Sequence, residues 1–330
     1  MQHLRQQLQQ AIEQDAIYGV SYGLIEPQHA QLGYLGHQGP QPPCLITPQM
    51  QYDLASLTKV VATTTRLLQL LCAQKVSLTD KLGNYLPDVG AKDATIAELL
   101  LHISGLPADL PDYHGLTKAE LIAKLKQVKP IRQNRGQVCY SDLGFIYLGW
   151  VIEKVDGNLV QSLIRNIFAP LKMASTQFNP QPSRNIVPTE QQAKRGGVIC
   201  GQVHDGKAYL LGGVSGHAGL FSTLEDLTNF VQMYLHQGMF QQQMILPPQA
   251  FNLLAEMGQD QRTLGWQRWQ KTPTKLWHTG FTGTSIGIDL LSKRGFICLT
   301  NRIYPTRQKQ AWLKIRQELA QQFFAGELQE

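Results

Sequence analysis

The sequence predicts an α/β protein of the α+β type, in which one antiparallel sheet is built from both ends of the chain. Three observations support this prediction: strand-like alternation near the N-terminus, helical periodicity through the middle, and renewed alternation in the last third. Strands at both ends with helices between them fit a sheet flanked by helices, with an all-helical subdomain inserted. We find no internal repeats. We therefore expect one unit over residues 1–330, with an α/β region at residues 1–75 and 196–330 and a mostly helical subdomain at residues 76–195.

The N-terminal elements are a helix and a hairpin. Residues 4–14 are amphipathic with the helical period, and residues 17–25 and 30–36 favour strands. A proline-containing turn at residues 26–29 separates these strands, as in a hairpin. The Pro-rich stretch at residues 39–43 is too short for a partner-binding polyproline element, so we interpret it as a linker toward an apolar helix at residues 60–73.

Helical periodicity dominates the middle of the chain, and alternation returns after it. The predicted helices span residues 95–102, 117–128, 142–155, 159–168, 222–236 and 313–324. The predicted strands span residues 195–203, 208–214, 263–269, 275–278, 284–291 and 295–300. Thr223 and Asp226 resemble a capping box before the helix at residues 222–236, although Asp is shorter than the usual Glu.

The composition is that of an ordinary globular protein. Hydrophobic residues make up 43% of the 330 residues, and the net charge is +6. Lys and Arg are densest at residues 118–129 and 302–316, which we interpret as solvated helix faces. Because no aromatic residues are interleaved with these charges, the sequence argues against a nucleic-acid partner.

The chain shows no signal for a membrane or an oxidising compartment. No apolar run approaches the roughly twenty residues that cross a bilayer, and the N-terminus lacks the apolar core of a signal peptide. The five cysteines are odd in number and lack Cys-x-x-Cys spacing. That pattern argues against a zinc site or a disulfide framework and favours free thiols. We expect a cytoplasmic protein with no membrane partner.

The first candidate for chemistry is the stretch around Ser56 and Lys59. If the helix begins there, the two side chains share one face, so the hydroxyl and the amine can meet. A serine attacks poorly until a base takes its proton, and burial or the helix dipole can lower a lysine pKa enough for that role. The pattern also arises by chance roughly once in a chain of this length. Asp53 or Ser56 could instead cap the helix, with Lys59 in solvent.

Tyr140 and Asp142 form a second candidate, in a turn immediately before a helix. Asp142 could simply be the N-cap of that helix. The hydroxyl of Tyr140 could shuttle a proton if a cation such as Lys59 lies nearby.

Two glycine-rich stretches complete the candidates. In residues 275–284, a strand containing His278 and Thr279 runs into Gly280 and Phe281, and its N–H groups could face a substrate carbonyl. The alternative is a plain hairpin turn. The loop at residues 212–221, which contains His217, matches neither a dinucleotide fingerprint nor a Walker loop, so we interpret it as a site-lining loop. The histidines lack metal-ligand spacing, and we expect neither a metal nor a cofactor.

Taken in chain order, these motifs resemble the set found in penicillin-recognising serine hydrolases: Ser-x-x-Lys at residues 56–59, Tyr140-Ser141-Asp142, and His278-Thr279-Gly280. The resemblance is strongest to the branch of class C β-lactamases, D-alanyl-D-alanine peptidases and related esterases. It covers nearly the whole chain, with supporting phrases at residues 99–106 and 219–223. It implies an antiparallel sheet beside a helical subdomain, with the site at their junction.

The resemblance also implies roles for individual residues. Ser56 would be the acylated nucleophile, Lys59 its proton partner and Tyr140 the relay to the leaving group. The N–H groups of Ser56 and Phe281 would form the oxyanion hole. Substrate-binding positions would include Thr279 and Gly280. His217, in the site-lining loop, would be either structural or substrate-facing.

Two positions depart from the family pattern. Asp142 replaces an Asn, so an acceptor-only carboxylate stands where an amide could donate; it could instead hold Lys59 protonated and favour Tyr140 as the base. His278 replaces a Lys, so a fixed charge becomes one expected to titrate near neutrality. Both changes weaken the expected grip on a substrate carboxylate, and we therefore expect no efficient β-lactam hydrolysis.

We expect a serine hydrolase that works through an acyl-enzyme on Ser56. Its substrate would be a small molecule or peptide, an ester or amide such as a D-amino-acid peptide or a cell-wall-derived fragment. The alternative is a non-catalytic binding protein that retains the fold. The sequence leaves open the natural substrate, the choice between Lys59 and Tyr140 as general base, and the oligomeric state.

Overall fold

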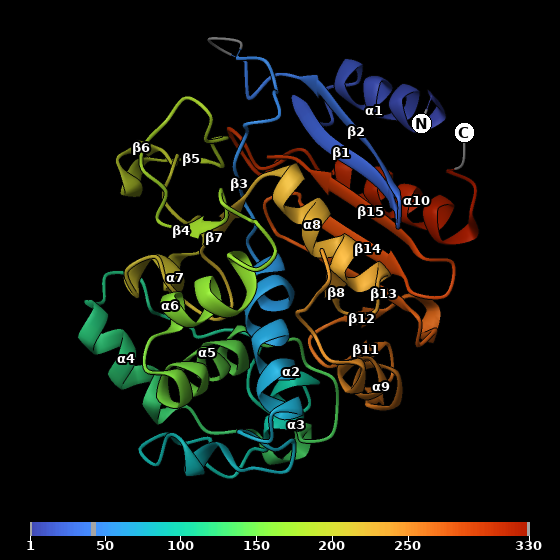
Figure 1. Cartoon of the computed structure of the whole chain (residues 1–330). Helices are drawn as coiled ribbons and strands as arrows, with labels where there is room; N and C mark the ends of the chain where they lie inside the picture. Colours follow the sequence, from blue (N-terminus) through green and yellow to red (C-terminus); the bar gives the residue numbers. More distant parts are fainter. Residues whose placement is uncertain (1, 41–43, 329–330) are drawn as a thin grey trace.

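The computed structural model describes residues 2–40 and 44–328, and its centre is an eight-stranded antiparallel sheet (Figure 1). The strand order is β10-β11-β12-β13-β14-β15-β1-β2. The N-terminal hairpin β1–β2 joins the C-terminal strands because β1 pairs with β15, with Ser21 opposite Leu299. The sheet is therefore built from both ends of the chain, and the predicted fold class is confirmed. Two residues of the predicted linker, Gly39 and Pro40, are described; residues 41–43 lie outside the described residues.

The strands are β1 Gly19–Glu26, β2 His29–Gly36, β3 Tyr52–Asp53, β4 Gln177–Phe178, β5 Gln191–Gln192, β6 Gly197–Val198, β7 Leu220–Ser222, β8 Met239–Phe240, β9 Gln243–Met244, β10 Gly258–Gln259, β11 Arg262–Thr263, β12 Gln267–Arg268, β13 Lys275–Thr279, β14 Ser285–Asp289 and β15 Arg294–Leu299. The α-helices are α1 Gln2–Glu13, α2 Thr65–Cys72, α3 Ile96–Leu100, α4 Lys118–Gln127, α5 Asp142–Asp156, α6 Leu159–Leu163, α7 Gly206–Leu210, α8 Leu224–Leu235, α9 Pro248–Glu256 and α10 Ala311–Ala325. There are also two π-helical segments in the described residues. Segment η1 Lys59–Thr64 continues into α2, and segment η4 Ile164–Phe168 follows α6.

Helices cover both faces of the sheet (Figure 1). Successive side chains of a strand point to opposite faces, so β15 places Phe296 toward one core and Ile297 toward the other. On the first face, α1 and α10 pack against the sheet, with Leu8 and Trp312 fully buried. On the second face α8 packs against the sheet, and this core runs without interruption into the helices α2, α3 and α5. Segment η1 and helix α2 thus lie between the sheet and the helical region.

Two predicted strands are wrong. Residues 208–214 overlap helix α7, because the Asp205 carboxylate accepts the Ala208 N–H and caps it. A short apolar run fits a strand and a helix equally well, and this polar cap decides between them. Residues 195–203 contain only the two-residue strand β6, because Gly196 and Gly197 adopt positive φ angles of 81° and 122° and turn the chain. The predicted strand 263–269 is also interrupted, at Gly265 with φ 74°.

The predicted capping box of α8 is half formed. The Thr223 side chain accepts the Asp226 N–H, but the Asp226 carboxylate accepts from Ser175 and Thr176 instead of closing the box. The shorter Asp side chain therefore tethers α8 to the loop before β4.

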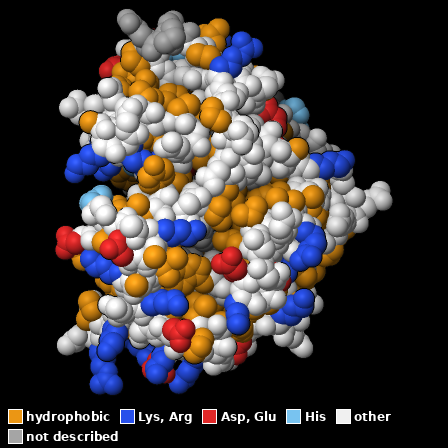
Figure 2. Space-filling model, turned by 90° about the vertical axis from the view of Figure 1, so that its left-hand side faces the viewer, with side chains coloured by type: hydrophobic (Ala, Val, Ile, Leu, Met, Phe, Trp, Pro, Cys, Tyr) orange, Lys and Arg blue, Asp and Glu red, His pale blue; other side chains and the backbone are white. Residues whose placement is uncertain are grey.

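None of the helices in the described residues is long and apolar enough to cross a membrane. On the face shown in Figure 2, Lys and Arg side chains are scattered among uncharged ones and do not merge into one basic patch.

Candidate active site

A cleft of about 780 Å³ lies where the start of η1 meets α5 and the end of β13. Its lining brings together segments that are far apart in the sequence. Of the residues singled out from the sequence, the lining includes Ser56, Tyr140, Asp142, His217, His278, Thr279, Gly280 and Phe281, and Lys59 lies directly beneath it, fully buried.

Ser56 follows a strained residue. Ala55 has φ 46°, in the left-handed region that non-glycine residues rarely adopt. Its N–H donates to the buried Asp53 carboxylate at 2.8 Å, and the same carboxylate accepts the His204 N–H at 2.6 Å. Asp53 therefore fixes the turn before Ser56 and does not cap the helix. Such strain is typical of functional sites, where surrounding contacts hold it in place.

The Lys59 ammonium has a complete set of acceptors. Its Nζ donates to Ser56 Oγ at 2.8 Å, to Asp142 Oδ1 at 2.8 Å and to the His217 carbonyl at 3.2 Å. An ammonium has three N–H donors, and all three are used here. Burial alone would lower the pKa of Lys59, but the Asp142 carboxylate and Tyr140 outweigh it, and the pKa is raised. The alternative with Lys59 in solvent is wrong. Of the two possibilities that the sequence left open for the pKa of Lys59, the raised pKa favours the one in which Asp142 holds the amine protonated.

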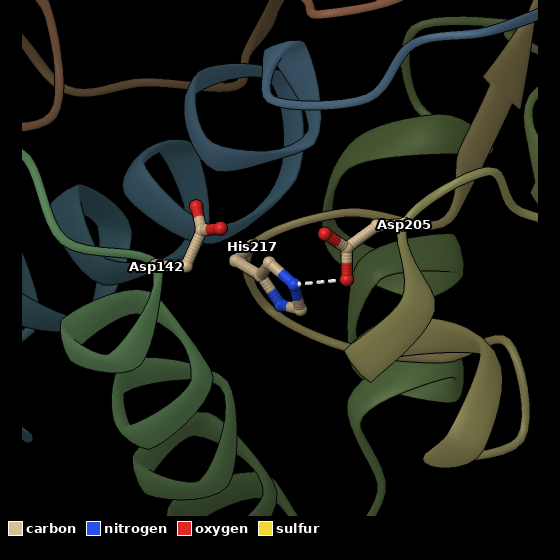
Figure 3. A group of neighbouring side chains, drawn as sticks. All are labelled: Asp142, Asp205 and His217. Atoms are coloured by element: carbon tan, nitrogen blue, oxygen red, sulfur yellow. Dashed lines mark hydrogen bonds and ion pairs between the residues drawn. The ribbon is translucent and has the colours of Figure 1, made fainter. Parts of the chain in front are cut away.

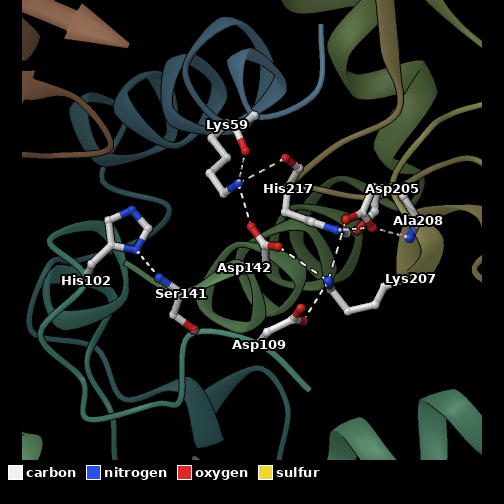
Figure 4. Close-up of polar contacts among 12 residues, drawn as sticks. Lys59, His102, Asp109, Ser141, Asp142, Asp205, Lys207, Ala208 and His217 are labelled. Carbon is white, nitrogen blue, oxygen red and sulfur yellow. Dashed lines mark hydrogen bonds and ion pairs between the residues drawn. The ribbon is translucent and has the colours of Figure 1, made fainter. Parts of the chain in front are cut away.

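Asp142 belongs to a chain of alternating charges that leads away from Lys59 (Figure 4). Its second oxygen lies 3.4 Å from Lys207 Nζ, and Lys207 also pairs with Asp109 at 2.7 Å and Asp205 at 3.5 Å. Burial alone would raise the pKa of Asp142, but Lys59, His217 and Lys207 lower it to about 2. Ser141 is the N-cap of α5, and the Asp142 side chain makes no capping bond, so the capping alternative for Asp142 is wrong.

Asp142, Asp205 and His217 have ligand-type atoms within 4.8 Å of one another (Figure 3). Two carboxylates and an imidazole could in principle hold a divalent cation. Here two ammonium groups bond Asp142, and His217 Nε2 is bonded to Asp205 Oδ1 at 2.8 Å. The donor atoms are thus already paired, and we interpret the cluster as a charge network that orients His217 and Lys59.

Tyr140 lies between two cations. Lys59 Nζ is 4.8 Å and the Arg262 guanidinium carbon 5.0 Å from its ring centroid. His102 packs against the ring at 4.5 Å and accepts the Ser141 N–H at its Nδ1, 3.0 Å away. The bond between His102 and Ser141 (Figure 4) fixes the turn that carries Tyr140, which lines the cleft.

The end of β13 is bound to the turn that carries Ser56. Thr282 Oγ1 donates to the Asp53 carbonyl at 2.8 Å, and Thr284 Oγ1 to the Leu54 carbonyl at 3.2 Å. At Gly280 a Cβ would lie 2.2 Å from Thr284 Oγ1 and 2.5 Å from the Leu54 carbonyl oxygen, so this close approach requires glycine. Among the described residues, the N–H groups of Ser56 and Phe281 have no hydrogen-bond acceptor.

One edge of β13 is open to the cleft. β12 pairs with β13 only as far as Trp277, whereas β14 pairs along the other edge through Thr279. The segment from His278 to Phe281 therefore offers backbone groups beside which an extended chain could lie.

His278 does not behave as the sequence predicts. Its ring is buried, with 3% of its surface exposed, and burial, together with Arg262 and Lys59, lowers its pKa well below the usual value. The expectation that His278 carries a charge titrating near neutrality is therefore wrong. A neutral imidazole therefore occupies the position at which the family motif has a lysine, and Arg262 is a cation close to it.

The sequence analysis missed the arginines of the cleft. Residues 302–316 were interpreted as a solvated helix face, but helix α10 starts at Ala311, Arg302 is buried, and Arg302, Arg307 and Arg316 line the cleft. An antiparallel pairing of residues 284–291 with 295–300 could have placed Arg302 beside the turn that follows β13. That pairing brings Thr300 Oγ1 to the Gly283 carbonyl at 3.3 Å.

The comparison with protein families agrees with this geometry. The model of the family described as Beta-lactamase matches residues 4–320. The chain belongs to the β-lactamase family of serine hydrolases. The family that the sequence motifs resemble is thereby confirmed.

Relatives and solved structures of this family cover most of the chain. A protein of Escherichia coli (strain K12) named "Putative D-alanyl-D-alanine carboxypeptidase" is 30% identical over 308 residues, which span 79% of this chain and 71% of the relative. The N-acetylmuramyl-L-alanine amidase of Bacillus subtilis (strain 168) is 29% identical, over 82% of this chain and 72% of the amidase. Among solved structures, EstCE1, a hydrolase with promiscuous acyltransferase activity, has a TM-score of 0.75 at 20% identity and covers 97% of this chain and 98% of its own. The D-alanine carboxypeptidase AmpC from Burkholderia cenocepacia has a TM-score of 0.73 at 19% identity, over 98% and 99% of the two chains. At these identities the structures establish the fold.

Proposed function

We propose that this hydrolase works through an acyl-enzyme on Ser56 and cleaves an ester or amide, such as a D-amino-acid peptide or a cell-wall-derived fragment. The observation that carries the proposal is the bond of 2.8 Å from Lys59 Nζ to Ser56 Oγ at the base of a cleft that Tyr140 also lines. A serine oxygen held by an ammonium is stabilised as it becomes anionic, which is what a nucleophile requires.

Tyr140 is the general base in this proposal. The Lys59 ammonium has no free lone pair and already donates to three oxygens, so it cannot take the Ser56 proton. The Tyr140 oxygen would take it, with Lys59 and Arg262 stabilising the negative charge, and would return it to the leaving group. The free N–H groups of Ser56 and Phe281 would hold the oxyanion of the tetrahedral intermediate.

The leaving group would lie on the Tyr140 side of Ser56, where it collects its proton. Arg262 lies on that side, and among the described residues no acidic side chain pairs with it and no hydrogen bond is formed by its guanidinium. It could therefore bind the terminal carboxylate of a departing D-amino acid, which the lysine of the family motif would otherwise contact. The Escherichia coli relative and the AmpC structure are both named carboxypeptidases, and these names are consistent with such a substrate.

The test of the acyl-enzyme is covalent labelling. Treatment with a fluorophosphonate and, separately, with a slowly deacylating penicillin should each give one adduct, located on Ser56 by peptide mass spectrometry. The Ser56→Ala variant should show no adduct and no turnover of p-nitrophenyl esters. Unchanged turnover in Ser56→Ala would contradict the proposal and favour a binding protein whose esterase signal arises elsewhere.

A cytoplasmic location is a separate proposal. It is supported by the five cysteines, all of which are free thiols, as expected in a reducing compartment. Fractionation of cells that produce the native chain tests it, and recovery with the periplasmic or extracellular fraction would contradict it.

A further inference from the structure

Arg302 is a buried cation for which no hydrogen-bond or ion-pair partner is found in residues 2–40 and 44–328. It follows β15 in the chain, only 5% of its surface is exposed, and it lines the cleft. Its Nε and Nη1 atoms are buried and make no hydrogen bond to any described residue. An isolated buried charge is costly, so a folded protein that keeps one usually pairs it with a ligand or a neighbour.

Two more guanidinium groups stand close to Arg302. Arg302 and Arg307 each lie 5.2 Å from the centroid of the Phe281 ring, which is 45% exposed in the cleft. Arg316 Nη1 lies 3.4 Å from the carbonyls of Gly280 and Thr284. Burial, and then mutual repulsion, lowers the pKa of Arg302 and of Arg316, the latter to about 10.

In the part of the chain that the structure describes, one carboxylate forms an ion pair with this cluster. Glu190 Oε1 accepts from Arg307 Nε at 2.8 Å, and its other oxygen bonds His204 at 2.6 Å. Among the described residues, no carboxylate forms an ion pair with Arg302 or Arg316. The site therefore carries a surplus of positive charge that an incoming anion would neutralise.

The position of the cluster indicates which part of the substrate it would meet. The proposed leaving group lies beside Tyr140 and Arg262, near the His278 end of the open β13 edge. At the other end of that edge, Arg302 and Arg307 lie against Phe281, and Arg316 contacts the carbonyl of the preceding Gly280. A chain lying along the edge, with its carbonyl held by the N–H groups of Ser56 and Phe281, would direct its acyl part toward Arg302.

We propose that Arg302, with Arg307 and Arg316, forms a subsite for an anionic group, a carboxylate or a phosphate, on the acyl part of the substrate. This subsite rests on the proposed acyl transfer at Ser56. It makes the hydrolase selective for acyl groups that carry a negative charge remote from the scissile bond. Arg302 acts as a specificity residue, and Phe281 supplies the flat surface between two of the guanidinium groups.

The experiment measures kcat and KM of the protein for three matched p-nitrophenyl esters. They are the hydrogen glutarate, its neutral methyl glutarate counterpart, and an ester with a phosphonate at the acyl end. The wild type should prefer an anionic ester, and the glutarate and phosphonate arms show whether carboxylate or phosphate fits better. In Arg302→Gln, KM for the anionic esters should rise roughly 10- to 100-fold, the value of a hydrogen bond to a charged group, while the neutral ester is unaffected. Arg302→Lys should retain part of the preference.

The control is Arg294→Gln, because Arg294 packs over Phe323 at the start of β15 and does not line the cleft. The preference should be unchanged in this variant. The melting temperature of Arg302→Gln should be equal to or above that of the wild type, since an unpartnered buried charge is removed. An equal loss for anionic and neutral esters, or no preference in the wild type, would overturn the subsite.

A binding measurement separates this proposal from the acyl-enzyme. Glutarate and inorganic phosphate are titrated calorimetrically into Ser56→Ala, with and without Arg302→Gln. Anion binding that is lost with Arg302→Gln supports the subsite even if Ser56 never forms an adduct. Labelling of Ser56 with no Arg302-dependent binding of either anion would overturn the subsite and leave the proposed function standing.

Discussion

Replacement of Asp142 by Asn separates the two proton-transfer schemes that the site allows. The substitution removes the carboxylate that bonds Lys59 at 2.8 Å and keeps a side chain of the same shape. The pKa of Asp142 lies at about 2 instead of 3.8, and at 1.36 kcal/mol per unit this difference corresponds to about 2 kcal/mol of stability. Because the pKa in the folded state is depressed, this contribution is present above about pH 4 and is lost as the pH falls through about 2.

Asp142→Asn should therefore lower the free energy of unfolding by about 2 kcal/mol at pH 7, and the difference from the wild type should shrink toward pH 2. The raised pKa of Lys59 has the opposite sign: its contribution is present below the usual pKa of 10.5 and is lost as the pH rises through the folded value. Without Asp142, burial dominates and the pKa of Lys59 should fall. Urea unfolding at a series of pH values measures both effects.

The kinetic assay is the pH profile of kcat/KM for p-nitrophenyl butyrate between pH 5 and 9. If Tyr140 is the base and Lys59 must stay protonated, activity in Asp142→Asn should decline at a lower pH than in the wild type. Asp109→Asn is the matched control, because Asp109 pairs with Lys207 and does not contact Lys59. A variant that is more active than the wild type at neutral pH would refute the scheme, since it would show that neutral Lys59 is the base.

Two further substitutions test the substrate-facing groups. In Gly280→Ala the Cβ would lie 2.2 Å from Thr284 Oγ1 and would displace the Phe281 N–H, so kcat should fall roughly 100-fold, the lower end of the loss of one oxyanion donor. An unchanged kcat, measured on variants whose melting curves confirm folding, would exclude Phe281 as a donor. In Arg262→Gln, KM for a D-alanyl-D-alanine peptide should rise about tenfold, while KM for a neutral p-nitrophenyl ester should be unchanged. An equal change in KM for both substrates would show that Arg262 supports Tyr140 instead of binding the leaving group.

The fold could be predicted because the hydrophobic period is strong in the long elements. Helix α5 and strands β1, β14 and β15 were found within a few residues, and each buries a face that its sequence pattern shows. The errors fall where backbone geometry outweighs pattern. Asp205 caps α7 in a run that alternates like a strand, and Gly196 and Gly197 turn the chain where the sequence predicted the start of a long strand.

The candidate site was predicted as a set of motifs, but its electrostatics were predicted only in part: the sequence suggested that Asp142 could keep Lys59 protonated and did not decide between that state and a neutral amine. Spacing indicates that Ser56 and Lys59 can meet, whereas the raised pKa of Lys59 depends on Asp142, 83 positions away in the chain. Burial of His278 depends on neighbours from several elements, so its neutral state could not be deduced from residue type. The division of the chain at residues 75 and 195 remains a prediction.

The unusual Asp142 explains another unusual feature of the site, the buried Lys207. A carboxylate at this position would be costly if only one ammonium balanced it, because Asp205 lies close and raises its pKa. Lys207, only 1% exposed, lies between Asp142, Asp205 and Asp109 and offsets that repulsion. The carboxylate and the second lysine therefore function as a pair, and their joint effect is to keep Lys59 charged. With Lys59 occupied by Ser56 and Asp142, and with His278 neutral, no positive charge remains on the motif residues to attract an anionic substrate. We propose that this task falls to the arginines at the two ends of the open β13 edge.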